Sequence, residues 1–317
     1  MSKVKSYLSL IKFAHTIFAL PFAMIGFCIG VIDLPKVPNV YYNMFGIDTG
    51  LKKMKLFLEH NWYIFILVLL CMIFARSAAM AFNRYLDKSF DGKNPRTAIR
   101  EIPSGLLKAN NVLLFTIVNC ILFVACTFFI NRLCFYLSPV ALAVVLGYSF
   151  TKRFTPLCHL ILGLGLSLAP IGAYLAVTGQ FSLLPIIFSF IVLFWVSGFD
   201  IIYALQDEEF DKENKLYSIP AALGKKNALL VSRVLHLLSA ACVMAAGILG
   251  NFGLWYWIGA ALFGGLLIYQ HTIVKLNDLK KVNLAFFTTN GIASVVFAIF
   301  VIADLFLSNN GNTIINN

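Results

Sequence analysis

The feature that most constrains this chain is a series of apolar runs, each about as long as a membrane-crossing helix. A hydrocarbon core roughly 30 Å thick requires about twenty apolar residues in a helix, because each residue advances about 1.5 Å. Nine such runs occur, at residues 13–33, 62–82, 111–130, 134–150, 157–177, 182–203, 228–249, 254–274 and 284–307. They predict an all-α integral membrane protein with nine transmembrane helices, in one domain that covers residues 1–317.

Composition and charge agree with a membrane protein. Hydrophobic residues make up 60% of the chain and charged residues 12%, which is not the composition of a soluble domain. With the N-terminus in the cytoplasm, 19 Lys and Arg residues fall in cytoplasmic segments and only 5 in outer segments. This bias predicts a cytoplasmic N-terminus and explains the net charge of +11 without nucleic acid as a partner. The seven cysteines form no CxxC pair, so neither a zinc site nor a disulfide framework is indicated.

An acidic motif follows the second apolar run. Asn83, Asp87 and Asp91 recur at every fourth residue. If the helix of that run continues so far, the three side chains lie on one helical face.

A second copy of the motif follows the sixth apolar run, with Asp200, Tyr203, Asp207 and Asp211. Placing Tyr203 opposite Asn83 aligns its two last aspartates with those of the first motif. Both copies fall on the predicted cytoplasmic side of the membrane.

Clustered carboxylates repel one another unless a cation shares them. Mg²⁺ prefers oxygen ligands and is usually held by a few carboxylates together with substrate phosphates. Two matched copies at a membrane surface therefore predict a site for Mg²⁺ and a diphosphate, with metal ligands Asn83, Asp87, Asp91, Asp207 and Asp211. A single copy would be explained equally well as a solvated helix end.

Basic residues accompany the acidic motifs. Arg76 lies inside the second run, two helical turns before Asn83, where it is costly unless it faces a polar cavity. Further candidates for binding a diphosphate are Lys93, Arg96, Tyr148, Lys152, Arg153, Lys212, Lys215 and Ser218. For the loop cations the alternative is an ordinary solvated loop or a positive-inside anchor.

Several other polar residues have no such pattern. His60, His159, His236 and His271 show no ligand spacing and are interpreted as structural. Asn290 lies in an apolar run, where a hydrogen bond between helices is the ordinary explanation. An amphipathic stretch at residues 44–60 is expected to lie along the outer membrane surface.

The motifs resemble the two signatures of the UbiA superfamily of membrane prenyltransferases. The first is followed by the segment Lys93-Asn94-Pro95-Arg96-Thr97, and the second reads Asp200-x-x-Tyr203-x-x-Gln206-Asp207-x-x-x-Asp211. Further matches are the segments 103–105 and 148–153 and the late Phe286-Phe287-x-x-Asn290. The resemblance implies nine transmembrane helices around a central cavity, with the active site under a cytoplasmic cap formed by the two long loops.

Within the superfamily the chain is most similar to the 4-hydroxybenzoate polyprenyltransferases. This likeness implies Mg²⁺-dependent transfer of a polyprenyl group from polyprenyl diphosphate to the ring of a small aromatic acid, in a bacterial cytoplasmic (inner) membrane. Asp200, Arg76 and Tyr203 are the expected catalytic residues, and Asn290 joins the substrate-binding candidates. The opening segment 11–21 is closer to relatives that prenylate 1,4-dihydroxy-6-naphthoate for menaquinone, so that acceptor stays an alternative.

An ion-coupled membrane transporter is the alternative from a different class. Transporters more often place their acids at mid-bilayer in broken helices and repeat their symmetry over the whole chain. Here the acids lie at the cytoplasmic helix ends and are grouped at four-residue steps, which favours an enzyme.

Overall fold

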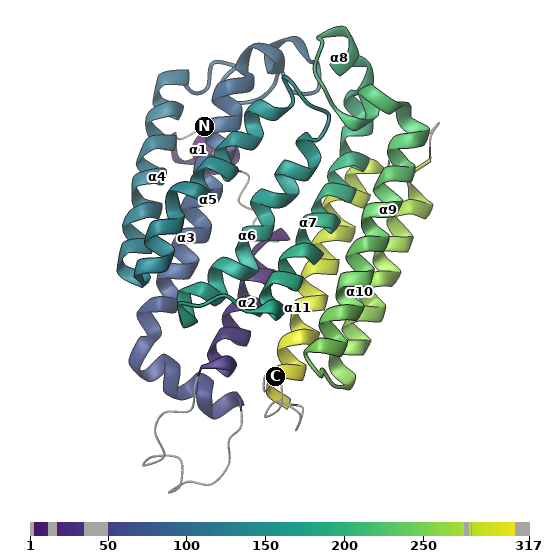
Figure 1. Ribbon diagram of the computed structural model, residues 1–317. Coiled ribbons are helices and arrows are strands. Elements are labelled where there is room, and N and C mark those ends of the chain that lie inside the picture. Colours follow the sequence, from purple (N-terminus) through teal and green to yellow (C-terminus); the bar gives the residue numbers. More distant parts are fainter. Residues whose placement is uncertain (1–2, 12–17, 35–49, 276–278, 280, 308–317) are drawn as a thin grey trace, which may run out of the picture.

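The regular structure is helical throughout the described residues of the computed structural model, which are 3–11, 18–34, 50–275, 279 and 281–307. The elements are α1 (Lys3–Ile11), α2 (Leu20–Asp33), α3 (Gly50–Lys93), α4 (Ala109–Ile130), α5 (Arg132–Thr151), α6 (Cys158–Thr178), α7 (Leu183–Ala204), η2 (Leu205–Asp207), α8 (Glu208–Glu213), α9 (Ile219–Leu249), α10 (Leu254–Ile273), η3 (Leu284–Thr289) and α11 (Asn290–Leu307) (Figure 1).

Each of the nine predicted runs overlaps one of these helices. Within the described ranges, seven helical stretches are long and apolar enough to cross a membrane. The 14-residue α2 is shorter and begins at Leu20, and residues 13–17 of its predicted run lie outside the described ranges. The 20-residue α10 is not among the seven. An all-helical membrane protein is therefore confirmed, while a count of nine crossings stays a prediction.

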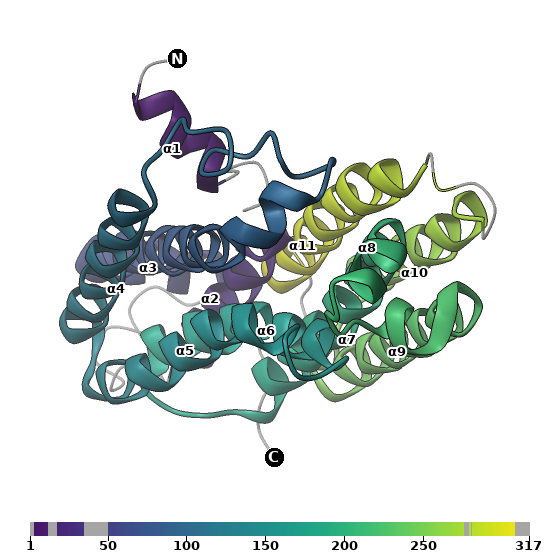
Figure 2. The ribbon, with the colours of Figure 1, turned by 90° about the horizontal axis from the view of Figure 1, so that it is seen from above.

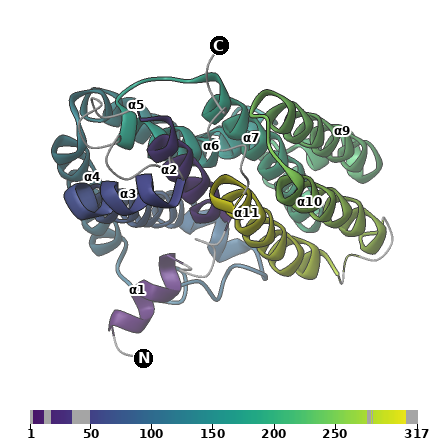
Figure 3. The same cartoon turned by 90° about the horizontal axis from the view of Figure 1, so that it is seen from below.

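The long helices form two groups with α2 between them. Seen from above, α3 to α6 lie on the left and α7, α9, α10 and α11 on the right (Figure 2). The view from below has the same arrangement (Figure 3). Contacts of α2 with α3, α6, α7 and α11 place it where the two groups meet.

Close approach of helices depends on small residues. A Cβ atom added to Gly26 in α2 would lie 2.0 Å from the carbonyl oxygen of Pro170 in α6. One added to Gly163 in α6 would lie 2.5 Å from the carbonyl oxygen of Leu193 in α7. Any side chain at these glycines would force the helices apart, as expected where membrane helices pack on small residues.

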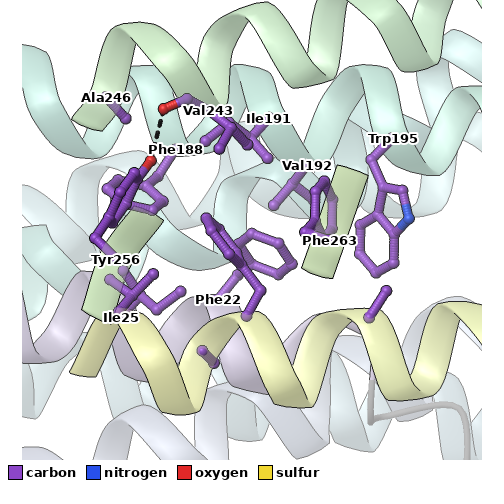
Figure 4. Packing of buried hydrophobic residues seen from close by; sticks show 14 of the residues in the cluster. Phe22, Ile25, Phe188, Ile191, Val192, Trp195, Val243, Ala246, Tyr256 and Phe263 are labelled. Atoms are coloured by element: carbon purple, nitrogen blue, oxygen red, sulfur yellow. Dashed lines mark hydrogen bonds between the residues drawn. The ribbon is translucent and has the colours of Figure 1, made fainter. Parts of the chain in front are cut away.

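Aromatic side chains fill the space on the α7 side of α2. Phe22 of α2 packs against Trp195 of α7 and Phe297 of α11, with ring centroids 5.4 and 6.0 Å apart (Figure 4). The buried Tyr256 hydroxyl donates to the carbonyl oxygen of Val243 at 2.7 Å, which satisfies its one polar group. This packing fixes α7 relative to α2 and α11. The second acidic motif begins on α7, with Asp200 and Tyr203.

The helix ends around α8 lie at one end of the molecule, and α1 lies toward the same end (Figure 1). Leu10 of α1 packs with Ala81 and Leu107, and the Ser9 hydroxyl donates to Glu101 at 2.5 Å. At the opposite end, residues 50–60 of the predicted amphipathic stretch form the first part of α3. The backbone kinks at Asn61, and residues 44–49 lie outside the described ranges.

Candidate active site

The first acidic group stands on the last turns of α3. This helix continues to Lys93, so Asn83, Asp87 and Asp91 all lie on it, as their spacing predicts. The Asn83 amide donates to Asp87 Oδ2 at 2.9 Å. One oxygen of Asp91, Oδ2, is buried and has no hydrogen-bond partner in the described part of the chain.

The second acidic group stands where α7 gives way to α8. Asp200 and Tyr203 lie in the last two turns of α7, Asp207 ends the short turn η2, and Asp211 lies in α8. The tighter turn of η2 redirects the chain without breaking it, so this motif stays helical from end to end.

Both groups meet at one polar cavity of about 280 Å³. Among the predicted site residues, those that line it are Arg76, Asn83, Asp87, Asp91, Arg96, Tyr148, Lys152, Arg153, Asp200, Tyr203 and Asp207. Asp211 lies behind this wall, because its fully buried carboxylate is held by Lys152 at 2.7 Å and by the Ser218 hydroxyl at 2.8 Å.

Basic side chains neutralise the carboxylates of the first group. Arg153 lies 2.9 Å from Asp87 Oδ1, and Arg100 lies 2.5 Å from Asp91 Oδ1. Both pairs are partly buried, and a paired charge costs less to bury than an isolated one. The cavity therefore brings carboxylates and fixed cations to the same surface.

Arg96 makes the most extensive of these contacts. Its guanidinium binds both oxygens of Asp207, Nε to Oδ1 at 3.1 Å and NH2 to Oδ2 at 2.5 Å. NH1 also donates to the Tyr203 hydroxyl at 2.8 Å. The loop that follows the first acidic motif is thereby bound, through Arg96, to Tyr203 and Asp207 of the second motif.

Two of the cations outside the helices have shifted pKa values. Burial, the largest single influence, lowers the pKa of Lys152, but the Asp211 carboxylate and its neighbours together raise it, so the net pKa lies above its usual range. Burial and the Asp207 carboxylate act on Arg96 in the same opposing way, and its net pKa is also raised. Both side chains therefore stay positively charged at neutral pH and suit an anionic ligand.

Two arginines lie deeper in the cavity. Arg76 and Arg84 line it from α3, and the Nε atom of each is buried without a hydrogen-bond partner in the described residues. Arg84 is only 4% exposed and was missed by the sequence interpretation. The one signal for it is its place directly after Asn83, just beyond the apolar run.

An apolar cavity of about 380 Å³ adjoins the polar one, between α3, α4, α5 and α6. Nearly all of its lining side chains are apolar. Arg76, Met80, Tyr148, Leu162 and Leu166 line both cavities. The two spaces therefore meet at Arg76 and Tyr148, the charged and the phenolic side chains shared between them.

Several predicted site residues do not reach the polar cavity. Lys93, Lys212 and Lys215 are exposed and do not line it, since Lys212 pairs with Glu208 at 2.6 Å on the outside of α8. Asn290 is fully buried in α11, where its side-chain oxygen accepts from the Trp195 indole at 2.9 Å.

One residue interpreted as structural belongs to the cavity instead. His159, in the first turn of α6, lines it, and its Nδ1 lies 2.7 Å from Asp200 Oδ2. No sequence spacing could have found this pair, because 41 residues separate its members.

The donor atoms fit a hard divalent cation. Carboxylate and amide oxygens are the ligands that Mg²⁺ prefers, and the buried Asp91 Oδ2 has a free coordination direction. Among the described residues, no three acidic, His or Cys side chains lie close enough to hold a metal ion by themselves. A cation here would therefore share its coordination between these side chains and an anionic ligand.

An all-helical membrane protein in which an acidic, cation-lined cavity adjoins an apolar one suits an amphiphilic anion. The chain belongs to the UbiA prenyltransferase family, whose family model matches residues 57–292. The prediction of an aromatic prenyltransferase is thereby confirmed, and the transporter alternative falls away.

Relatives and solved structures agree with this assignment. The 4-hydroxybenzoate octaprenyltransferase of Aliivibrio fischeri (strain MJ11) is 28% identical over 75% of this chain and 82% of its own length. That of Tolumonas auensis is 30% identical over 72% and 79%. An apo UbiA homologue from Aeropyrum pernix K1 superposes with a TM-score of 0.76 at 28% identity, over 92% of this chain and 98% of its own. A UbiA homologue from Archaeoglobus fulgidus bound to DMAPP and Mg²⁺ has the same fold, with a TM-score of 0.68 at 21% identity over 95% and 99%.

Proposed function

We propose that this single-domain enzyme transfers a polyprenyl group from polyprenyl diphosphate to the ring of a 4-hydroxybenzoate-type acid. The observation that carries the proposal is the junction of the two cavities at Arg76 and Tyr148. A polar cavity with carboxylates and cations suits a metal-bound diphosphate, and an adjoining apolar cavity suits the hydrocarbon chain attached to it.

The diphosphate head would lie among Lys152, Arg153 and Arg96. We assign Asn83, Asp87, Asp91 and Asp207, which line the cavity, as residues that hold Mg²⁺ with it. Asp211, behind the cavity wall, would join them once Lys152 turns from its carboxylate to the phosphate. When bound, Mg²⁺ supplies positive charge that stabilises the departing diphosphate. The binding of DMAPP and Mg²⁺, and of GPP and Mg²⁺, to relatives of the same fold supports this assignment. Lys152 and Arg96 exchange their carboxylate partners for phosphate oxygens as the ligand enters.

The acceptor carboxylate is assigned to Arg76. Its Nε has no hydrogen-bond partner in the described residues, and a guanidinium binds a carboxylate through two parallel hydrogen bonds. Arg153 is the competing candidate, but it already binds Asp87 at 2.9 Å and the carbonyl oxygen of Leu86 at 3.0 Å. The buried Arg84 is assigned a different role, to balance the negative charge of the neighbouring Asp91 and Glu101.

In the transfer step the allylic C–O bond breaks and the electron pair leaves with the diphosphate. A ring carbon ortho to the phenol forms the new C–C bond, and that carbon then loses its proton. We assign Asp200 as the base that takes this ring proton or the proton of the phenol hydroxyl. Tyr203 holds Arg96 through its hydroxyl, and its ring packs in a tilted arrangement against that of Phe286, with centroids 4.2 Å apart, so the pair would shield the reacting cation from water.

Orientation follows from the charge bias and the placement of the acids. We propose that α1 and the polar cavity face the cytoplasm of a bacterial inner membrane, where Mg²⁺ and phosphorylated metabolites occur. The segments 94–107 and 205–218 would cover the site as a cap.

The test uses membranes that contain the expressed protein, incubated with Mg²⁺ and octaprenyl diphosphate. 4-Hydroxybenzoate and 1,4-dihydroxy-6-naphthoate are supplied separately, and the lipid products are identified by mass spectrometry. We expect prenylated 4-hydroxybenzoate. A product from the naphthoate alone would assign the alternative acceptor, and no product from either would contradict the proposal.

A further inference from the structure

A second contact of His159, besides the one with Asp200, determines which of its ring nitrogens carries the proton. His159 is 3% exposed, and its Nδ1 lies 2.7 Å from Asp200 Oδ2. On the other side of the ring, Nε2 accepts a hydrogen bond from the backbone N–H of Ile219 at 3.4 Å. A ring nitrogen that accepts carries no proton, so the proton of the neutral imidazole is on Nδ1 and is donated to Asp200.

The donor from Ile219 is a fixed feature of the fold. Ile219 is the first residue of α9, so its N–H is one of the amides that the helix leaves unpaired. The partial positive charge of a helix N-terminus disfavours a proton on the facing Nε2. His159 is therefore poorly placed to act as a base through that nitrogen.

The same short segment also holds the second acidic group. Ser218 caps α9 by accepting from the Ala221 N–H at 3.3 Å, and its hydroxyl donates to Asp211 at 2.8 Å. The Tyr217 N–H donates to the Lys152 carbonyl oxygen at 2.7 Å. Residues 217–219 at the start of α9 thus contact His159, Asp211 and the end of α5 together.

We propose that His159 is a positioning residue that orients the base Asp200 and occupies its Oδ2, which leaves Oδ1 to take the proton in prenyl transfer. The proposal rests on the proposed function, because it assigns a role within the same reaction. It gives the two neighbouring residues different roles: Asp200 accepts the proton from the substrate, and His159 only donates a hydrogen bond to Asp200.

Two substitutions test which nitrogen matters. His159→Asn places an amide N–H near the position of Nδ1, whereas His159→Gln places its amide near Nε2 and loses the donor to Asp200. We expect His159→Asn to keep kcat within about threefold of wild type, and His159→Gln to lower it about 10- to 100-fold, the usual range for losing a group that orients a reactive one. KM for the prenyl diphosphate should stay within about twofold in both. Equal kcat values for the two variants would overturn the proposal.

A second comparison excludes a purely structural role. In an Asp200→Asn background, His159→Gln should cause no further loss in single-turnover product formation, because residues that act as a unit are not additive. A further tenfold loss there would overturn the proposal. His159→Ala replaces His159→Gln if thermal melting in detergent shows that the latter does not fold. A wild-type protein that forms no product would instead contradict the proposed function itself.

Discussion

Arg96 binds both carboxylate oxygens of Asp207, and in doing so it joins the loop that follows α3 to the turn η2 that follows α7. The two residues are 111 positions apart in the chain. Asn94 adds a hydrogen bond to the same carboxylate at 3.3 Å, so this loop contacts the second acidic group through two side chains. The cavity is thus closed on one side by a charged contact that a diphosphate would have to replace.

Replacing Arg96 by lysine tests that contact. A lysine ammonium is a single point charge and cannot bind two oxygens and the Tyr203 hydroxyl in the same plane. We expect Arg96→Lys to lower kcat/KM for the prenyl diphosphate about 10- to 100-fold. Initial rates of diphosphate release measure it, with Lys108→Gln, an exposed cation of the same segment, as the control that stays at the wild-type rate. An unchanged kcat/KM for Arg96→Lys would remove Arg96 from the binding site.

Asn290 should affect stability and not substrate binding. Its oxygen accepts from the buried Trp195 indole, and its amide donates to the carbonyl oxygens of Ala285 and Phe286 in η3 at 2.9 and 3.2 Å. Asn290→Leu removes these hydrogen bonds and the acceptor of the buried Trp195 N–H, and should cost about 1–3 kcal/mol for that buried donor. Thermal melting in detergent measures the loss. A raised KM with an unchanged melting temperature would return Asn290 to the substrate site.

The apolar cavity should set which prenyl chains fit. Gly172 of α6 lines it, and a Cβ atom there would meet nothing within 4 Å, so a larger side chain grows into the cavity. We expect Gly172→Phe to lower kcat/KM for octaprenyl diphosphate at least about tenfold, while dimethylallyl diphosphate reacts as before. Gly265→Phe on the exposed face of α10 is the matched control. Equal losses for both chain lengths would place the hydrocarbon elsewhere.

The sequence predicts the site's scaffold well because that scaffold is local. A four-residue step places side chains on one helical face wherever the helix continues, and α3 does continue through Asp91. The apolar runs likewise predict the helices, because crossing a bilayer requires a fixed length.

The sequence predicts the surroundings of the acids less well, because those depend on tertiary contacts. Lys212 follows Asp211 in α8 and Lys215 lies just after that helix, but both side chains are exposed, and composition carries no information about which side chains turn outward. His159 meets Asp200 only because α6 packs on α7 at Gly163. Arg84 is buried, and the charged groups near it include Arg100 and Glu101 of the following loop, which sequence spacing does not bring together.

The central claim is that the acids of both motifs act on one metal-bound diphosphate. The most direct measurement is diphosphate release as Mg²⁺ is removed with EDTA and returned, in wild type, Asp87→Asn, Asp211→Asn and the control Glu59→Gln, whose carboxylate is exposed at the far end of α3. We predict that wild type and Glu59→Gln lose release in EDTA and regain it with Mg²⁺. Both aspartate variants should stay at least about 100-fold slower at any Mg²⁺ concentration although they remain folded. Release that survives EDTA, or wild-type rates in either aspartate variant, would contradict the claim.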